Sequence, residues 1–164
     1  TLLGGSTTSI NSALQRARTT TEHGRHRQAN SKVSEPTAAQ KTLLGRYVKA
    51  WEELDLDGFV ALLKEDALYT MPPLSQWYMG RQSIRAFFEW AWRDYDGYRL
   101  LTTAANGQPA FAAYARSGAE WTAHSIQVLS LEHDAISSLT LFVKPSSPLL
   151  FQAFGLLLTL GDKR

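Results

Sequence analysis

Cysteine is missing from the sequence: none of its 164 residues carries a thiol. Disulfide bonds, thiolate metal sites and cysteine nucleophiles are therefore excluded. Long hydrophobic runs are missing as well, since the longest apolar stretch covers only residues 148–160, whereas a membrane-spanning helix needs about 20 residues. No secretory signal peptide is recognisable. We therefore expect a chain that works in the cytoplasm without a membrane partner.

Charges of both signs are present, but they are distributed unevenly. The net charge is +2, and residues 1–35 alone contribute +3, from five Lys and Arg against two Glu, which leaves −1 for the remainder. A basic segment attached to a nearly neutral domain fits contact with nucleic acid at one end of the chain. For residues 22–35 a solvated linker is an equally natural interpretation.

Residues 3–18, LGGSTTSINSALQRAR, have the periodicity of an amphipathic helix. Apolar side chains recur at i, i+3, i+4 and i+7 from Ile10, and Ser6 is a suitable N-cap. The opposite face carries short hydroxyl and amide side chains, and the last turns carry arginines. Such side chains can reach base edges and phosphates in a DNA major groove. On periodicity alone, an ordinary amphipathic surface helix is the alternative.

The same stretch resembles the end of region four in extracytoplasmic-function (ECF) sigma factors of the sigma-70 family. There the recognition helix of a helix-turn-helix reads the −35 promoter element. The matching residues are Leu3, Gly4, Ser6, Ile10, Asn11, Ser12, Ala13, Leu14, Gln15, Arg16, Ala17 and Arg18. The resemblance implies DNA contacts from Thr8, Asn11, Ser12, Gln15, Arg16 and Arg18. Because only the recognition helix is present, we expect the C-terminal part of a longer sigma factor, whose partners are the RNA polymerase core and promoter DNA.

Residues 22–36 are predicted to be a linker between residues 1–21 and a domain at residues 37–164. The linker contains Gly24, several polar residues and almost no apolar side chain. His23 and His26 lie within it, but no carboxylate or third histidine follows at the spacing of metal ligands. A solvated basic tract is therefore favoured over a metal site, and we expect no metal or other cofactor.

The pattern after Pro36 predicts an α+β domain. Helices are expected from Pro36 to about residue 54, within residues 54–67, and after Gly80, each with an apolar face. Strands are expected at residues 68–73, 76–80, 98–105, 110–116, 121–131 and 135–143, with an Asn-Gly turn at residues 106–107. A closing helix is expected at residues 148–154. Three helices against a curved antiparallel sheet suggest a cone with an open mouth.

This order of elements resembles the SnoaL-like members of the nuclear transport factor two (NTF2) superfamily, the fold of ketosteroid isomerases and polyketide cyclases. Three motifs resemble, more specifically, the C-terminal extension of one sigma-factor subgroup, over about residues 37–156. They are Met71-Pro72-Pro73, Trp77-Tyr78-Met79-Gly80-Arg81 and Asn106-Gly107-Gln108-Pro109-Ala110. The C-terminal GLLLTL departs from that subgroup's Pro-containing ending. The resemblance implies a domain that regulates the sigma core through contact or ligand binding.

A cone of this kind can hold a small ligand among aromatic side chains. His124 is expected to point inward on one strand face with Ile126 and Val128, because side chains alternate along a strand. Arg81 is expected to pin the mouth of the cone, to bind an anion there, or to contact the Met-Pro-Pro turn. The predicted pocket residues are Tyr47, Trp51, Tyr69, Met71, Trp77, Arg81, Phe88, Trp121 and His124. The expected occupant is a small apolar or aromatic molecule or a segment of the sigma core, and a closed aromatic core is the alternative.

No catalytic constellation is recognisable in the predicted cone, so we assign no catalytic residue and expect no enzymatic activity. Ketosteroid isomerases use an Asp base with a Tyr and a protonated acid as oxyanion donors. The corresponding strand here reads ALYTMPP and contains no carboxylate. Asp55 and Asp57 flank a short predicted helix and are expected to be capping or solvated residues.

The sequence therefore favours a sigma factor with a C-terminal SnoaL-like regulatory domain. A small-molecule isomerase, cyclase or hydrolase of the same fold is the second hypothesis. A structural module that forms a homodimer is the third. The recognition helix separates these hypotheses, because an isolated enzyme has no use for one.

Overall fold

The computed structural model describes residues 36–161 of the chain. The chain divides into two units between Glu35 and Pro36, and the described residues belong to the second unit. The predicted linker is therefore outside the described residues, apart from Pro36. The predicted DNA contacts also lie outside them: Thr8, Asn11, Ser12, Gln15, Arg16 and Arg18.

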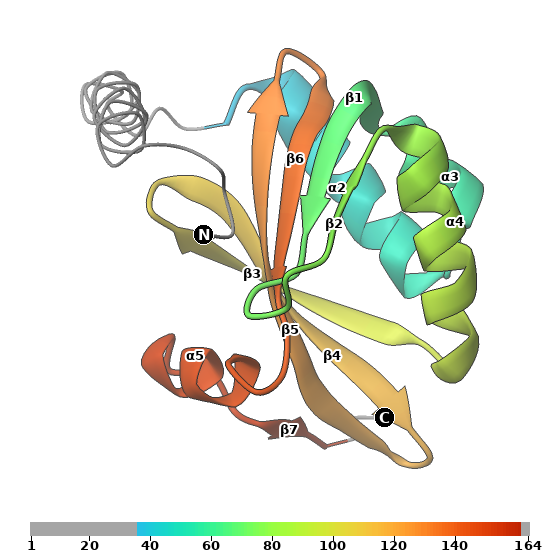
Figure 1. Cartoon of the computed structure of the whole chain (residues 1–164). Helices are drawn as coiled ribbons and strands as arrows, with labels where there is room; N and C mark the ends of the chain where they lie inside the picture. The colour runs from blue at the N-terminus through green and yellow to red at the C-terminus, as the bar shows by residue number, and fades with distance from the viewer. Residues whose placement is uncertain (1–35, 162–164) are drawn as a thin grey trace, which may run out of the picture. The chain divides into compact units, whose positions relative to one another are not determined.

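The described residues form helices packed on a curved sheet (Figure 1). In chain order the elements are α2 (Ala38–Glu52), α3 (Leu56–Ala61), β1 (Leu63–Thr70), β2 (Trp77–Met79), α4 (Arg81–Ala91), the 3-10 helix η1 (Trp92–Asp94), β3 (Tyr98–Ala105), β4 (Gln108–Ser117), β5 (Glu120–Glu132), β6 (Ala135–Phe142), α5 (Ser147–Ala153) and β7 (Thr159–Leu160). The strand order is β2-β1-β6-β5-β4-β3, and β7 pairs with β5. Only the β1–β6 pair is parallel within these described residues. The predicted α+β class is confirmed.

Helix α2 begins at Ala38, two residues after Pro36, because Thr37 caps it. The Thr37 hydroxyl accepts a hydrogen bond from the backbone N–H of Gln40 at 3.2 Å, and the Gln40 side chain accepts one from the Thr37 N–H at 3.0 Å. This reciprocal capping box satisfies two backbone donors that the helix cannot pair internally. Leu43, Tyr47 and Trp51 then lie on the buried face of α2, as their spacing predicts.

The hairpin between β3 and β4 follows the Asn-Gly prediction. Ala105 pairs with Gln108, so Asn106 and Gly107 form a two-residue turn. Both turn residues have positive φ, 52° for Asn106 and 76° for Gly107. A type I′ turn requires this conformation, and Asn-Gly adopts it at the lowest cost.

The second predicted helix is too long. Helix α3 ends at Ala61, and the chain from Leu63 onward is strand β1 rather than helix. Leu63 pairs with Ile136 of β6, and the Ile136 N–H donates to the carbonyl of Leu62 at 2.9 Å. Long-range pairing with β6 therefore overrides the local helical preference of LLKEDA. The short elements η1 and β7 were not predicted.

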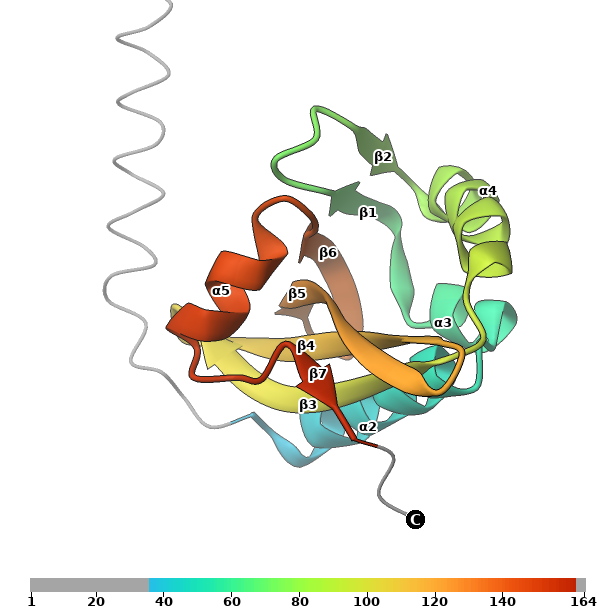
Figure 2. The same cartoon turned by 90° about the horizontal axis from the view of Figure 1, so that it is seen from below.

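The sheet separates two hydrophobic clusters. Helices α2, α3 and α4 cover one face, here called the inner face, and α5 packs on the other, the outer face (Figures 1 and 2). Side chains along β4 alternate between them: Phe111 and Ala113 belong to the inner cluster, whereas Ala112 and Tyr114 belong to the outer cluster. Both faces of the central strands are therefore apolar, as for a sheet buried on both sides.

Candidate functional site

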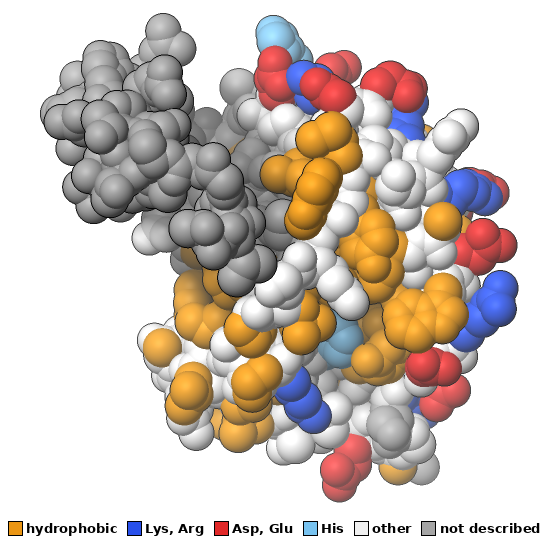
Figure 3. Space-filling model, viewed as in Figure 1, with side chains coloured by type: hydrophobic (Ala, Val, Ile, Leu, Met, Phe, Trp, Pro, Cys, Tyr) orange, Lys and Arg blue, Asp and Glu red, His pale blue; other side chains and the backbone are white. Residues whose placement is uncertain are grey.

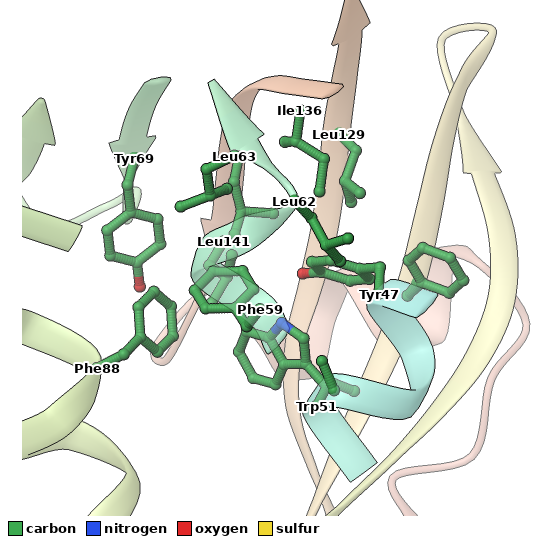
Figure 4. Packing of buried hydrophobic residues seen from close by; sticks show 14 of the residues in the cluster. Tyr47, Trp51, Phe59, Leu62, Leu63, Tyr69, Phe88, Leu129, Ile136 and Leu141 are labelled. Atoms are coloured by element: carbon green, nitrogen blue, oxygen red, sulfur yellow. The ribbon is translucent and has the colours of Figure 1, made fainter. Parts of the chain in front are cut away.

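The inner cluster holds most of the predicted pocket aromatics. Tyr47, Trp51, Tyr69 and Phe88 are each at most 2% exposed, and Met71 packs in the same cluster. The Trp51 ring lies 5.4 Å from that of Phe88 and 6.0 Å from that of Tyr47, between ring centroids. Figure 4 shows these side chains converging from α2, β1 and α4. At these spacings the rings fill the space between them, so here the closed aromatic core describes the structure and an open pocket does not.

Trp77 does not join this cluster. In β2, Tyr78 pairs with Tyr69 and lies on the inner face, while Trp77 pairs with Thr70 and lies on the outer face. Trp77 is 62% exposed as a result. The expectation that Trp77 lines the inside of the cone is wrong, because neighbouring residues of a strand point to opposite faces.

Trp121 also lies outside the cone. It belongs to the outer cluster and pairs with Arg116 of β4. The guanidinium carbons of Arg99 and Arg116 lie 4.7 Å and 5.7 Å from the centre of the Trp121 ring. The two arginines thus make cation–π contacts with it. Trp121 is a packing residue of the outer face, which corrects its predicted place in the pocket.

Arg81 ties helix α4 to the start of β1. Its Nε donates a hydrogen bond to the carbonyl of Leu63 at 2.7 Å, and Nη2 donates to the same oxygen. Nη1 donates to the carboxylate of Glu65. Arg81 therefore joins two elements of the fold, and its partners are the first residues of β1 rather than the Met-Pro-Pro turn.

A row of polar side chains crosses the inner face along β5. The Tyr47 hydroxyl donates to Oε1 of Gln127 at 2.7 Å, and Nε2 of Gln127 lies 3.5 Å from the hydroxyl of Ser125. Nδ1 of His124 lies 3.0 Å from the same hydroxyl. Gln127 and Ser125 are fully buried. This row is the most polar part of the interior, and sequence reasoning found only Tyr47 and His124 of it.

His124 points inward, but not for the predicted reason. Ser125 pairs with Ala113 and Ala123 pairs with Tyr114, so His124 is an extra residue in a β-bulge. Its ring meets the edges of Tyr95 and Tyr98, at centroid distances of 5.1 Å and 5.4 Å. Ile126 packs in the outer cluster. The bulge breaks the two-residue period, so the prediction that His124 shares a face with Ile126 and Val128 is wrong.

Two grooves lie away from the inner cluster. The Pro groove, of about 500 Å³, is lined by Leu68, Thr70, Pro72, Pro73, Leu74, Ser75, Gln76, Trp77 and Met79. The hairpin groove, of about 440 Å³, is lined by Ala104, Ala105, Asn106, Gln108, Ile126, Val128, Ser130, Thr140, Phe142, Leu150 and Phe154. Among the predicted pocket residues, only Trp77 lines either groove. Each of the three motifs named in the sequence analysis contributes residues to one of these grooves. The sequence did not predict a groove at either place.

Comparison with known protein families identifies the family to which this fold belongs. Residues 44–139, more than half of the chain, match the family described as the SnoaL-like domain. The chain belongs to the SnoaL-like domain family. The predicted resemblance is thereby confirmed for the region that contains α3 to β5 and most of β6.

Curated relatives extend the similarity beyond the SnoaL-like domain. The chain is 35% identical over 156 residues to the ECF RNA polymerase sigma factor SigG of Mycobacterium tuberculosis, in the CDC 1551 / Oshkosh and H37Rv strains. The match covers 94% of this chain and 41% of SigG. The chain thus spans about two fifths of the length of these relatives.

Solved structures share the fold of the SnoaL-like domain. A candidate ketosteroid isomerase from Kribbella flavida is 23% identical, with a TM-score of 0.52 over 65% of this chain and 78% of that one. An NTF2-like protein from Burkholderia xenovorans is 10% identical, with a TM-score of 0.57 over 74% of this chain and 96% of that one. At these identities the likeness concerns the fold alone.

The interior of the SnoaL-like domain is electrically neutral at pH 7. Burial, and to a smaller extent the charge of Lys144, lowers the pKa of His124 to about 4. Burial raises the pKa of Tyr47, Tyr69 and Tyr98, so their hydroxyls stay protonated. Every Asp and Glu between residues 36 and 161 is exposed. The polar row can therefore donate and accept hydrogen bonds, but it holds no ionised base.

Two further classes of feature are absent from the described part of the chain. Residues 36–161 contain no cluster of three or more His, Asp or Glu side chains arranged to hold a metal ion. None of the helices in that range is both long and apolar enough to cross a membrane.

Proposed function

We propose that this chain is part of an ECF-type sigma factor, which directs RNA polymerase to promoters with a −35 element. One observation carries the proposal: the similarity to SigG covers 94% of the chain. Residues 36–164 make up less than four fifths of the sequence, so the similarity extends into residues 1–35. That segment contains the predicted recognition helix. The proposed partners are the RNA polymerase core and promoter DNA, in the cytoplasm.

The SnoaL-like domain serves this sigma factor as a regulatory module without catalysis. The exposed position of every described carboxylate supports a non-catalytic role, because the Asp base and the protonated acid that a ketosteroid isomerase uses would have to lie inside the fold. Regulation requires that a ligand or a protein contact favour one of two arrangements of the complete protein.

Arg16→Ala tests the DNA-reading assignment. The experiment measures promoter binding by RNA polymerase holoenzyme assembled with the full-length sigma factor. If Arg16 contacts a base, its loss should cost about 1–3 kcal/mol and relax specificity at one position of the −35 element. Arg46→Ala provides the control, because Arg46 is an exposed arginine on α2. Unchanged affinity and promoter preference for Arg16→Ala would contradict the proposal.

A small-molecule isomerase or cyclase is the second candidate, and the buried polar row favours it. Tyr47, Gln127, Ser125 and His124 form a continuous series of hydrogen-bonding groups inside the fold. Because every carboxylate among residues 36–161 is exposed, none lies beside this row to act as the Asp base, and we expect no turnover of steroid-like or polyketide-like ketones. Turnover that disappears in both His124→Ala and Tyr47→Phe would establish the enzyme instead.

A further inference from the structure

The hairpin groove has the features of a binding site and lies on the opposite face of the sheet from the polar row. Its floor consists of outer-face side chains of β5 and β6, including Val128, Ser130 and Thr140. Leu150 and Phe154 from α5 and the following turn line one side, and the β3–β4 hairpin lines another. Figures 1 and 2 show α5 and the hairpin lying at the same end of the sheet. Figure 3 shows hydrophobic side chains gathered over α5 and the neighbouring strands.

Polar side chains in this groove are oriented by hydrogen bonds to neighbours and keep further donors and acceptors for a ligand. Nε2 of Gln108 donates to the hydroxyl of Ser130 at 2.8 Å, which orients the Gln108 amide. The other N–H and the carbonyl oxygen of that amide remain able to bind. The Thr140 hydroxyl accepts from Thr70 at 3.1 Å and keeps its own proton to donate. A ligand would thus meet an oriented amide and an oriented hydroxyl.

No lining residue of the hairpin groove carries a charge: the set consists of aliphatic, aromatic, amide and hydroxyl side chains. An ionised ligand would lose water there without gaining a counter-charge, which is costly. A neutral ligand with an apolar body would bury that body against Ile126, Val128 and Phe154. The volume of about 440 Å³ falls within the range of small-molecule sites, roughly 300–1,000 Å³.

We infer that the hairpin groove binds an uncharged small molecule that combines an apolar ring with an amide or carbonyl group. The ring lies on the floor beside α5, and the amide pairs with Gln108 and Thr140. This assignment concerns a face that the predicted cone pocket did not include. It also stands independently of the proposed sigma-factor function, because it rests only on the lining of the groove.

A matched pair of probes tests the inference on the 164-residue chain. Indole-3-acetamide is neutral and carries a primary amide, whereas indole-3-acetate has nearly the same shape and a negative charge. Titration of the ¹⁵N-labelled chain should give amide shifts at Ala105, Val128 and Thr140 with indole-3-acetamide. We expect indole-3-acetate to bind at least about tenfold more weakly, which corresponds to 1.4 kcal/mol.

Two substitutions in the groove and one outside it locate the binding. Val128→Trp fills the floor and should abolish the shifts, and Gln108→Ala should weaken binding about five- to tenfold without filling space. Met79→Ala, in the Pro groove, is the control and should leave binding unchanged. Circular dichroism and the urea midpoint establish that each variant is folded. If Val128→Trp does not fold, Gln108→Ala decides alone.

Any one of four results would overturn the inference. Equal binding of the two probes would show that the lining does not select neutral ligands. Shifts that survive both groove substitutions, or that Met79→Ala removes, would place the site elsewhere. Sedimentation equilibrium that gives a dimer, converted to monomer by Val128→Trp, would show that a second copy of the chain covers the groove.

Discussion

The hydrogen bond between Tyr47 and Gln127 offers the sharpest test of the buried polar row. The Tyr47 hydroxyl donates to Oε1 of Gln127 at 2.7 Å, and both residues are fully buried. Tyr47→Phe removes the donor while the ring keeps its stacking on Phe111, at a centroid distance of 5.4 Å. Oε1 of Gln127 then lies buried without its donor, which should lower the free energy of unfolding by about 1–3 kcal/mol.

A double-mutant cycle isolates this interaction. Gln127→Leu removes the acceptor and strands the Tyr47 hydroxyl, so it should also cost about 1–3 kcal/mol. When both residues are replaced, no polar atom of the pair is left unpaired, and the combined loss should fall at least about 1 kcal/mol short of the sum of the single losses.

Urea unfolding followed by tryptophan fluorescence measures all four proteins. Tyr78→Phe is the matched control, because the Tyr78 ring is half-buried and its hydroxyl has no hydrogen bond among the described residues. It should change stability by a few tenths of a kcal/mol. Additive losses in the cycle, or a Tyr47→Phe variant as stable as the Tyr78→Phe control, would refute the reasoning.

Three other predictions follow from the site. The pKa of His124 is about 4 in the folded protein against the usual 6.5, so the unfolded chain binds more protons between these two pH values. The free energy of unfolding, measured by urea titration, should therefore fall by about 2 kcal/mol from pH 7 to pH 5. A His124→Gln variant that shows the same fall would contradict this. Arg81→Met should lower the free energy of unfolding by about 1–3 kcal/mol, because it leaves the buried Leu63 carbonyl without its donors. Glu65→Gln should lower it by less than about 1 kcal/mol, because the Glu65 side chain is 83% exposed. Equal losses of stability in thermal unfolding would show that the ion pair dominates. A Gly→Ala change inside a helix usually stabilises it, but Gly58→Ala should not stabilise α3, because the new Cβ would lie 2.1 Å from Oδ2 of the capping residue Asp55. In an Asp55→Ala background the same change should raise the free energy of unfolding by up to about 1 kcal/mol. An equal effect in both backgrounds would refute the clash.

Elements whose signal is local were predicted well. Strand β3 has the predicted bounds, residues 98–105, because the Asn-Gly turn and the strand-forming residues before it point to the same hairpin. Helix α2 was predicted to within two residues at each end, because its apolar face has a clear helical period. The beginning of β1 was missed, since LLKEDA is helical by propensity and becomes a strand only when β6 lies beside it.

The candidate site, too, divides into residues placed by a local pattern and residues placed by contacts with distant segments. Alternation along β2 could have placed Trp77 on the outer face once Tyr78 was assigned to the core, because neighbouring residues of a regular strand point to opposite faces. The position of His124 was not accessible in this way, since nothing local marks the bulge that sets it opposite Ile126. Gln127 reads as an ordinary polar strand residue until Tyr47, 80 residues away, is placed above it.

By itself, the sequence determined the fold class, the order of the main elements and the absence of thiol chemistry. Those properties depend on composition and on periods of two to four residues, which the chain carries whatever its partners. The strand predicted to lack a carboxylate, ALYTMPP, begins earlier than predicted, so that β1 includes Glu65 and Asp66, and both of these side chains are exposed. Only the tertiary structure decided which aromatics meet. It packed Tyr47, Trp51, Tyr69 and Phe88 into a closed core and turned Trp77 and Trp121 to the other face. The reason is that strand register and bulges are fixed by pairing between distant segments, and a shift of one residue moves a side chain from one face of a sheet to the other.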